Sequence, residues 1–344
     1  MKYRSILILL MVSYLTSSAI GADKRPNVLF ISIDDLNDWL GCYGGHPQVK
    51  TPHIDRLAGE GVLFSNAHCQ APICNPSRVS LILGQLPSTT GMYFLAPNFR
   101  TVEKTQDAET LFQYFRRHDY YLSTMGKIFH GKVDKPSFDH LVGMVLDGLE
   151  ASGEADNTII VLWSDHGFHL GEKQRWAKRT LWEETTRVPL IITAPGMSAG
   201  EVCSRPVGLI DLYPTLTDMC GLPSKADNEG VSLKPLLQNP HAIWEQPVLT
   251  TFGPNNHSIR SEHWRYTQYV DGTEELYDHR KDPNEWTNLA SNPEYAQIMG
   301  KHRTSIPTLN AVALPGSAGS DSPLYGEGGG VSLSEVMGRV TSKQ

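Results

Sequence analysis

Two runs of apolar residues in the first two hundred positions are followed within two residues by an aspartate. Asn27–Ile33 is rich in β-branched and aromatic residues, and Thr158–Trp163 is a second run of the same kind. Continuous apolar runs of this length are typical of strands that are buried on both faces of a sheet. Asp34 and Asp35 follow the first run, and Ser164 and then Asp165 follow the second. The pattern predicts two buried strands that carry carboxylates at their C-terminal ends.

Between and after these strands, apolar residues recur at helical spacing. Helices are expected over residues 51–58, 110–117, 142–149 and 211–220. Further strands are expected over residues 120–125 and 187–192. Ligands of open α/β sheets bind beyond the C-terminal strand ends. The alternation therefore predicts an α/β fold with a site near the two predicted strand ends.

From about Trp244 the pattern changes to short strands joined by turns. Strands are expected over residues 248–252, 264–270 and 275–278, with Asp271-Gly272 as a hairpin-type turn. These elements predict a smaller C-terminal subdomain over residues 244–316. His257 lies in a Gly-Pro-Asn-Asn-His segment that either borders a substrate pocket or is a plain polar loop. Residues 317–344 are rich in Gly and Ser and are expected to form a flexible tail.

Composition fits a globular protein with one large and one smaller domain. The chain has 344 residues, of which 40% are hydrophobic and 19% charged. The formal net charge of -7 gives no basis for nucleic-acid binding.

Residues 1–21 have the pattern of a secretory signal peptide. Lys2 and Arg4 supply positive charge, Ile6–Leu15 is apolar, and Ala19-Ile20-Gly21 is a small-residue cleavage site. The apolar run is too short for a stable membrane span, although an uncleaved anchor is the alternative. We therefore expect an exported protein, secreted or periplasmic, that begins near Ala22 or Asp23.

The most distinctive stretch for chemistry is Cys74-Asn75-Pro76-Ser77-Arg78. It has no second Cys or His at the spacing of a zinc site. Pro76 restricts the backbone, and a helix is expected to start just after it with Ser77 as a candidate cap. Cys74 would then lie at a helix N-terminus beside a guanidinium, where an anion is favoured.

The number of cysteines adds a constraint. There are five, an odd number, so in an exported chain one thiol is spared or modified. Cys203 and Cys220 are a candidate disulfide pair, but the sequence leaves the connectivity open.

C-x-P-S-R, followed by Leu83-Gly84 and Thr90-Gly91, resembles the signature of the type I sulfatases, in the iduronate-2-sulfatase and choline-sulfatase branch. The resemblance implies an alkaline-phosphatase/sulfatase-like fold, a mixed sheet sandwiched by helices, over residues 23–243. It also implies that a formylglycine-generating enzyme oxidises Cys74 to formylglycine, whose hydrated aldehyde is the nucleophile. The alternative is a buried structural cysteine.

Asp34 and Asp35 at one strand end would repel each other unless a cation lies between them. Their alternative role is to cap the next helix. The resemblance implies one calcium ion held by Asp34, Asp35, Asp165, His166 and the modified Cys74. Calcium prefers oxygen, so His166 is the least secure ligand, and a hydrogen bond to the nucleophile is its alternative role.

The resemblance also implies residues that bind the sulfate. Lys127 and His130, in Gly-Lys-Ile-Phe-His, are similar to a family pair in which the Lys contacts sulfate and the His contacts the formylglycine. Lys178, after Trp-Ala, corresponds to a second sulfate-binding lysine. Arg78 would hold the aldehyde hydrate through its rigid fork, and His130 is the expected base. Taken alone, Lys127 and His130 are typical of a solvated face.

The resemblance covers about residues 25–289 and has a gap near residues 131–139. Family members carry there a further strand that ends in Lys-Pro-His, whose His serves as the acid, whereas this chain has Lys135-Pro136-Ser137. Loss of an interior strand exposes two sheet edges or forces them to pair anew.

Three functions follow as hypotheses. The first is an exported sulfatase that hydrolyses sugar, choline or aryl sulfates with calcium and formylglycine, whose second hydroxyl allows sulfate to be released. The second is a phosphonate or phosphate monoester hydrolase with the same nucleophile. The third is an internally deleted, non-catalytic protein that binds sulfated ligands. The expected partners are a sulfated small molecule or glycan and the formylglycine-generating enzyme.

Overall fold

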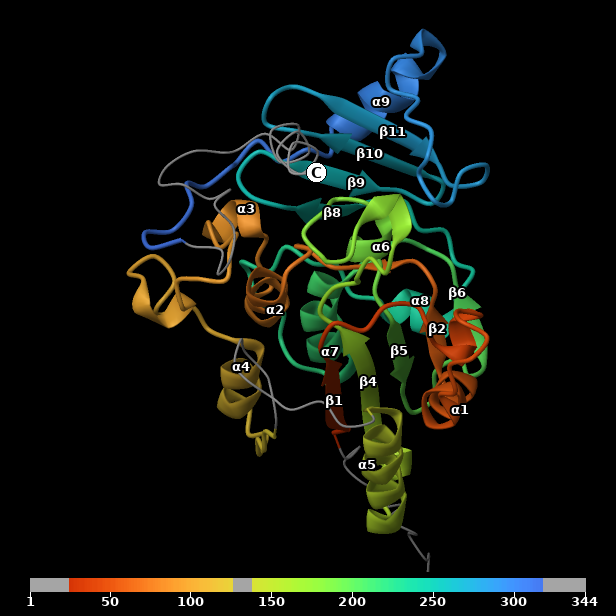
Figure 1. Cartoon of the computed structure of the whole chain (residues 1–344). Coiled ribbons are helices and arrows are strands. Elements are labelled where there is room, and N and C mark those ends of the chain that lie inside the picture. The colour runs from red at the N-terminus through yellow and green to blue at the C-terminus, as the bar shows by residue number, and fades with distance from the viewer. Residues whose placement is uncertain (1–24, 126–137, 318–344) are drawn as a thin grey trace, which may run out of the picture.

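The computed structural model describes residues 25–125 and 138–317, which form a layered α/β body and a smaller sheet above it (Figure 1). The predicted signal peptide and all but the first residue of the predicted tail lie outside these ranges. The boundary predicted between residues 243 and 244 stays a prediction.

The central sheet has five strands in the order β1-β4-β5-β2-β6. Their bounds are β1 Asn27–Ile33, β4 Thr158–Ser164, β5 Leu190–Thr193, β2 Val62–Phe64 and β6 Glu201–Cys203. β1 and β4 are parallel, as are β2 and β6, whereas β5 runs antiparallel to both of its neighbours. The sheet is therefore mixed, as predicted.

Alternate residues of β4 face two separate cores, because side chains of a strand alternate between the faces of a sheet. Ile159, Val161 and Trp163 belong to one core, and Ile160 and Leu162 belong to the other. The first core is covered by α2 (Cys74–Leu83), α4 (Leu111–Arg117), α7 (Leu212–Met219) and α8 (Lys234–Gln238). The second core is covered by α1 (Pro52–Glu60) and α5 (Phe138–Ser152). Helices on both faces explain why β4 is buried throughout and apolar from Ile159 to Trp163.

The second sheet is antiparallel, with the strand order β11-β10-β9-β8. Its strands are β8 Val248–Thr251, β9 His257–Arg260, β10 Trp264–Gln268 and β11 Glu274–Asp278, and α9 (Ala296–Arg303) packs on it. Figure 1 shows the short helix α6 (Glu183–Thr186) between the upper end of β4 and this sheet. The remaining α-helix of the described residues is α3 (Pro87–Thr90), and β3 (Ala67–His68) and β7 (Val207–Gly208) form a separate two-stranded sheet. Within residues 25–125 and 138–317, the helices all fall short of the length and hydrophobicity that a membrane crossing requires.

The strand predicted over Tyr120–Met125 is absent from the structure. Tyr120 packs on Phe115 with a centroid distance of 4.8 Å, and its hydroxyl donates to Pro26 O at 3.1 Å. Tyr121 and Met125, however, are 94% and 91% exposed. Tyr120 and Leu122 pack against the first core, but no strand of the described residues pairs with this segment, so its apolar pattern does not produce a strand.

The candidate Cys203–Cys220 disulfide is not formed, because both cysteines are free and buried. Cys203 lies on β6, paired with Phe64 of β2, and Cys220 follows the C-terminus of α7. Both belong to the first core, and burial raises the pKa of each thiol. They act there as small apolar side chains.

Candidate active site

The strand register brings the predicted acidic residues together. β1 and β4 pair from Asn27 with Thr158 to Ile33 with Ser164, so the residues that follow the two strands emerge side by side. Asp35 has a left-handed backbone with φ of 58°, and its N–H donates to Asp165 Oδ1 at 3.3 Å. The parallel pairing therefore positions both halves of the predicted metal site.

The N-terminus of α2 completes this group. The helix begins at Cys74 itself, two residues before Pro76, and not after the proline as predicted. Proline fits there because the first N–H groups of a helix need no partner within it. Ser77 is not the cap: it lies inside the helix, and its hydroxyl donates to Asp165 O at 2.5 Å. This hydrogen bond fixes the start of α2 against the end of β4.

Four predicted ligands converge. The ligand atoms of Asp34, Cys74, Asp165 and His166 lie within 4.8 Å of one another. Asp35 joins them through its Oδ1, 3.1 Å from His166 Nε2. The structure thus brings together all five residues that were expected to bind calcium.

Arg78, one helical turn after Cys74, is buried at the back of the group. Its Nε donates to Asp165 Oδ2 at 2.8 Å, and its two terminal nitrogens donate to Ser32 Oγ at 2.9 Å and Asp34 Oδ1 at 3.3 Å. Burial raises the pKa of Asp165, but the neighbouring His166 and Arg78 lower it by more, so that it lies well below its usual range. The Arg78 guanidinium therefore favours the ionised form of Asp165, a role that the sequence did not predict.

Lys178 enters from the loop between β4 and α6. Its Nζ lies 2.5 Å from Asp35 Oδ1, 3.0 Å from Cys74 Sγ and 3.0 Å from His166 Nε2. Burial lowers the pKa of Lys178, but Cys74 and Asp35 raise it by more, so that it lies above its usual value. The predicted sulfate-binding lysine is thus a charged group beside the predicted nucleophile.

The tautomer of His166 follows from its contacts. Nδ1 lies 2.8 Å from the carbonyl oxygen of Gly167, which only accepts, so Nδ1 carries the proton. Burial lowers the pKa of His166, which leaves the ring neutral and the lone pair of Nε2 facing Asp35 and Lys178. A lone pair and a carboxylate 3.1 Å apart repel unless positive charge lies between them. In this structure the Lys178 ammonium provides that charge.

This donor set fits calcium in part. Three carboxylates, from Asp34, Asp35 and Asp165, provide the oxygen ligands that calcium prefers. The thiol of Cys74 does not suit it, because sulfur is a soft ligand. Burial also raises the pKa of Cys74 to about 11, so an unmodified thiol would be a poor nucleophile at neutral pH. The residues fit the ion once an oxygen replaces the sulfur at position 74.

Other predicted residues do not join the site. Lys127 and His130 lie outside the described residues, so their predicted roles are not tested. His257 is not in a loop but on β9, 2% exposed, with its ring nitrogens on Thr251 Oγ1 at 3.0 Å and Asn310 Oδ1 at 2.7 Å. It has a structural role, because both nitrogens are used inside the second sheet and its flank.

Ser164 is a supporting residue of the site that was not predicted from the sequence. Its hydroxyl accepts from Leu36 N at 3.1 Å and donates to His166 O at 3.0 Å, which ties the segments after β1 and β4 together. A hydroxyl that directly precedes Asp165 at the end of a buried strand was the available signal.

Comparisons with known proteins agree with this geometry. The protein-family profile described as "Sulfatase" matches residues 26–138 and 136–222. A sulfatase of Formosa agariphila is 29% identical over 442 aligned positions, which cover 83% of this chain and 87% of the relative. The Delta 4,5-hexuronate-2-O-sulfatase of Bacteroides thetaiotaomicron is 34% identical over 183 positions, which cover 48% of this chain and 37% of the relative.

A solved structure shares the fold. It is the complex of a protein with its substrate D-glucosamine-2-N,6-O-disulfate, with a TM-score of 0.65 and 19% identity over 82% of this chain and 97% of the other. The fold is thus the predicted alkaline-phosphatase-like one with a small antiparallel sheet. Because the family profile covers more than half of the residues, this chain belongs to the sulfatase family, the hydrolases of sulfuric esters.

Proposed function

We propose that this protein hydrolyses sulfate esters of sugars at the group around Cys74, with formylglycine made from that cysteine and one calcium ion. The observation that carries the proposal is the contact of Lys178 Nζ with Cys74 Sγ, at 3.0 Å, beside three carboxylates. A hexuronate sulfatase among the relatives and a glucosamine disulfate in a related structure favour a sulfated sugar as the substrate.

Modification of Cys74 agrees with the chemistry of its surroundings. The thiol is 3% exposed and neutral, and it lies at the first turn of α2. An aldehyde hydrate at this position would supply an oxygen nucleophile in place of sulfur. Nε2 of His166, 3.3 Å from Sγ, carries a lone pair that can accept the proton of such a nucleophile. The role of His130 as a base stays a prediction from the sequence, separate from this contact of His166.

Calcium would be held by the carboxylates of Asp34, Asp35 and Asp165, with His166 at their side. Bound there, the ion would supply positive charge that polarises a sulfate oxygen and offsets the charge of the transition state. Arg78 keeps the carboxylates of Asp34 and Asp165 oriented through the planar fork of its guanidinium.

Lys178 is proposed to bind the sulfate of the substrate. Its ammonium is a mobile point charge on a long side chain, 18% exposed, and it can turn from Asp35 toward an incoming anion. A charge-assisted hydrogen bond to sulfate would orient the ester against position 74.

The proposal is tested by producing the protein with a formylglycine-generating enzyme and assaying it with calcium. An aryl sulfate, an aryl phosphate and a sulfated hexuronate disaccharide are compared. We expect turnover of the sulfates and little of the phosphate. Faster cleavage of the phosphate would favour the phosphate-ester hypothesis, and no cleavage by folded, aldehyde-bearing protein would favour the non-catalytic one.

Two observations support an internally shortened chain, and so keep the non-catalytic alternative open. The alignment with the Formosa agariphila sulfatase extends over 442 positions, more than the 344 residues present here. The family profile also matches in two parts that meet at residues 136–138. The second observation supports a change near the predicted gap at residues 131–139, whereas the alignment length carries no information on position.

Removal of calcium is expected to lower both activity and stability. Chelation should abolish turnover, and calcium at a hundred times its Kd should raise the free energy of unfolding by about 2.7 kcal/mol. Thermal unfolding with chelator and with calcium measures the shift. Asp35→Ala serves as the matched variant, because it removes the carboxylate of a side chain that is 26% exposed. A full calcium shift in Asp35→Ala would place the ion elsewhere.

A further inference from the structure

Lys178 lies on an irregular loop, residues 171–182, which we call the lysine loop. Lys173 and Arg179 in this loop have left-handed backbones, with φ of 50° and 79°. Such angles are uncommon for residues other than glycine and persist where surrounding contacts impose them. One such contact joins Arg179 N to Pro72 O at 3.1 Å, close to Cys74 in the chain. The backbone conformation that directs Lys178 toward the site is therefore held by contacts with residues outside the loop.

Arg265 of β10 holds the C-terminal end of the lysine loop. It is completely buried, and it donates to Leu181 O at 3.2 Å, Thr186 Oγ1 at 2.9 Å and the carboxylate of Glu183. Its Nε donates to Glu285 Oε1 at 2.6 Å. A single side chain of the second sheet thus contacts the loop and the α6 helix that follows it.

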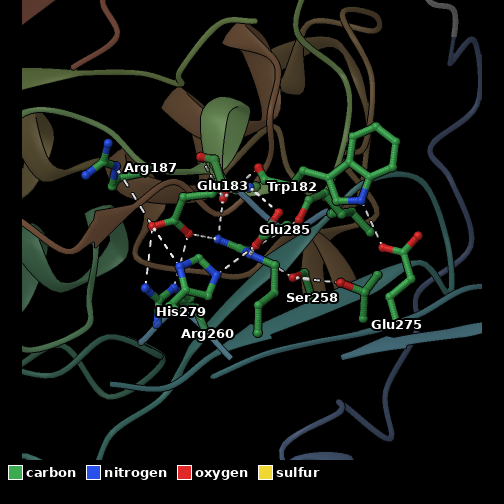
Figure 2. A network of polar contacts seen from close by, with 12 residues as sticks. Trp182, Glu183, Arg187, Ser258, Arg260, Glu275, His279 and Glu285 are labelled. Carbon is green, nitrogen blue, oxygen red and sulfur yellow. Dashed lines mark hydrogen bonds and ion pairs between the residues drawn. The ribbon is translucent and has the colours of Figure 1, made fainter. Parts of the chain in front are cut away.

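Glu285 contacts both ends of the lysine loop, and Figure 2 shows it beside Glu183 and His279. Its Oε2 accepts from Glu183 N at 2.9 Å, and its backbone carbonyl accepts from Lys173 Nζ. Its Oε1 is shared by Arg265 and by His279 Nε2, at 2.9 Å from the latter. Lys173 lies near the start of the loop and Glu183 directly follows its last residue, so Glu285 links the two segments that flank Lys178.

The first end of the loop has a second anchor. The ammonium of Lys173 lies 4.2 Å from the ring centre of Trp182 and 4.7 Å from that of Tyr277 on β11. Such cation–π contacts are stronger when the cation is partly desolvated, as it is here. Trp182 in turn donates from Nε1 to Glu275 Oε2 at 2.9 Å (Figure 2). Both ends of the loop therefore rest on the second sheet.

The charges argue against a second metal site in this network. The ligand atoms of Glu183, His279 and Glu285 lie close enough to hold an ion. Arg260, at 3.1 Å from Glu183 Oε2, and Arg265 already neutralise the two carboxylates. A buried ion pair of this kind stabilises a fold no better than apolar side chains do, but it fixes one geometry. The contribution of this network is therefore the position in which it holds the chain around Glu183 and Glu285.

We propose that Lys173, Arg265 and Glu285 are positioning residues for Lys178, so that the second sheet determines where the sulfate-binding ammonium lies. This inference rests on the proposed role of Lys178 in sulfate binding. Loosening the lysine loop would leave the fold intact but spread Lys178 over several positions. A displacement of about 1 Å costs up to about a hundredfold in rate. We expect KM for the sulfate ester to rise more than kcat falls.

The test uses Lys173→Met and Arg265→Lys, each alone and combined with Lys178→Met. We expect each single variant to lower kcat/KM for an aryl sulfate by about tenfold to a hundredfold. In the Lys178→Met background we expect little further loss, because residues that act through one another are not additive. Lys173 is partly exposed, so its variant tests the proposal even if Arg265→Lys does not fold.

Arg303→Met is the matched control. It removes a 48% exposed guanidinium that pairs with Glu274 of the same sheet at 2.7 and 2.8 Å and contacts Tyr266 OH at 3.2 Å, rather than the lysine loop. Hydrogen exchange of amides 171–182 should increase in Lys173→Met and stay unchanged in Arg303→Met. If the parent protein does not hydrolyse the aryl sulfate, the variants are compared by their affinity for inorganic sulfate, measured by calorimetry, instead of by kcat/KM.

The outcomes separate this inference from the proposed function. Parental activity and sulfate affinity in Lys178→Met would overturn the role of the lysine itself. Loss in Lys178→Met, together with parental values in Lys173→Met and Arg265→Lys, would overturn the positioning role alone. Additive losses of kcat/KM in the double variants would also overturn the positioning role. They would mean that Lys173 and Arg265 affect activity by a route that does not involve Lys178.

Discussion

Replacing Cys74 with alanine is expected to lower kcat/KM for an aryl sulfate by about a thousandfold or more. The reason is that position 74 carries the proposed nucleophile, at the centre of Asp34, Asp165 and His166. Alanine leaves no atom there that can attack sulfur. The measurement is steady-state hydrolysis with calcium, by protein whose aldehyde content is known from mass spectrometry.

Two further variants make this result specific. Cys74→Ser restores a single oxygen, so we expect at most one turnover, because one hydroxyl cannot release the sulfate that it has taken up. Cys220→Ala removes another buried thiol, in the first core, and is expected to keep the parental rate. An alanine variant at position 74 with the parental rate would refute the assignment of the nucleophile.

The second large effect is expected on stability, from Arg78→Met. Asp165 is 0% exposed and Asp34 is 19% exposed, and both would lose their guanidinium partner. Removing one partner of a buried ion pair costs about 3–5 kcal/mol, because the remaining charge is left uncompensated. We expect the free energy of unfolding in chelator to fall by roughly that amount.

Calcium should reduce this loss, since the ion would neutralise the same two carboxylates. Urea unfolding of the parent and of Arg78→Met, each with chelator and with saturating calcium, gives the four free energies that are needed. Arg303→Met is again the control, and an exposed pair of its kind contributes less than about 1 kcal/mol. Unchanged stability of Arg78→Met in chelator would contradict the interpretation of a buried, ionised pair.

Much of the fold could be predicted because its signals are local. β1 and β4 are continuous apolar runs, and α1 and α7 have apolar residues at helical spacing. The carboxylates at the strand ends could also be placed, since parallel strands end at one edge of a sheet. These features depend on a few neighbouring residues, so the sequence contains them directly.

The wrong predictions concern features that depend on neighbours from other parts of the chain. β9 reads His-Ser-Ile-Arg, a polar pattern, yet all four residues are buried because β8 and β10 pair on its two sides. Residues 120–125 are more apolar but lack such partners. Ser77 was a candidate helix cap in the sequence, but its hydroxyl donates a hydrogen bond to the carbonyl oxygen of Asp165 instead.

The sequence by itself determined which groups are proposed to carry the chemistry: the motif at Cys74, the acidic strand ends and the lysine after Trp-Ala. Only the tertiary structure decided their geometry. The contact of Lys178 with Cys74 joins residues 104 positions apart, and Arg265 reaches Glu183 across 82 positions. Contacts at such separations leave no periodic pattern in the chain, because they form only when packed sheets and loops bring the side chains together.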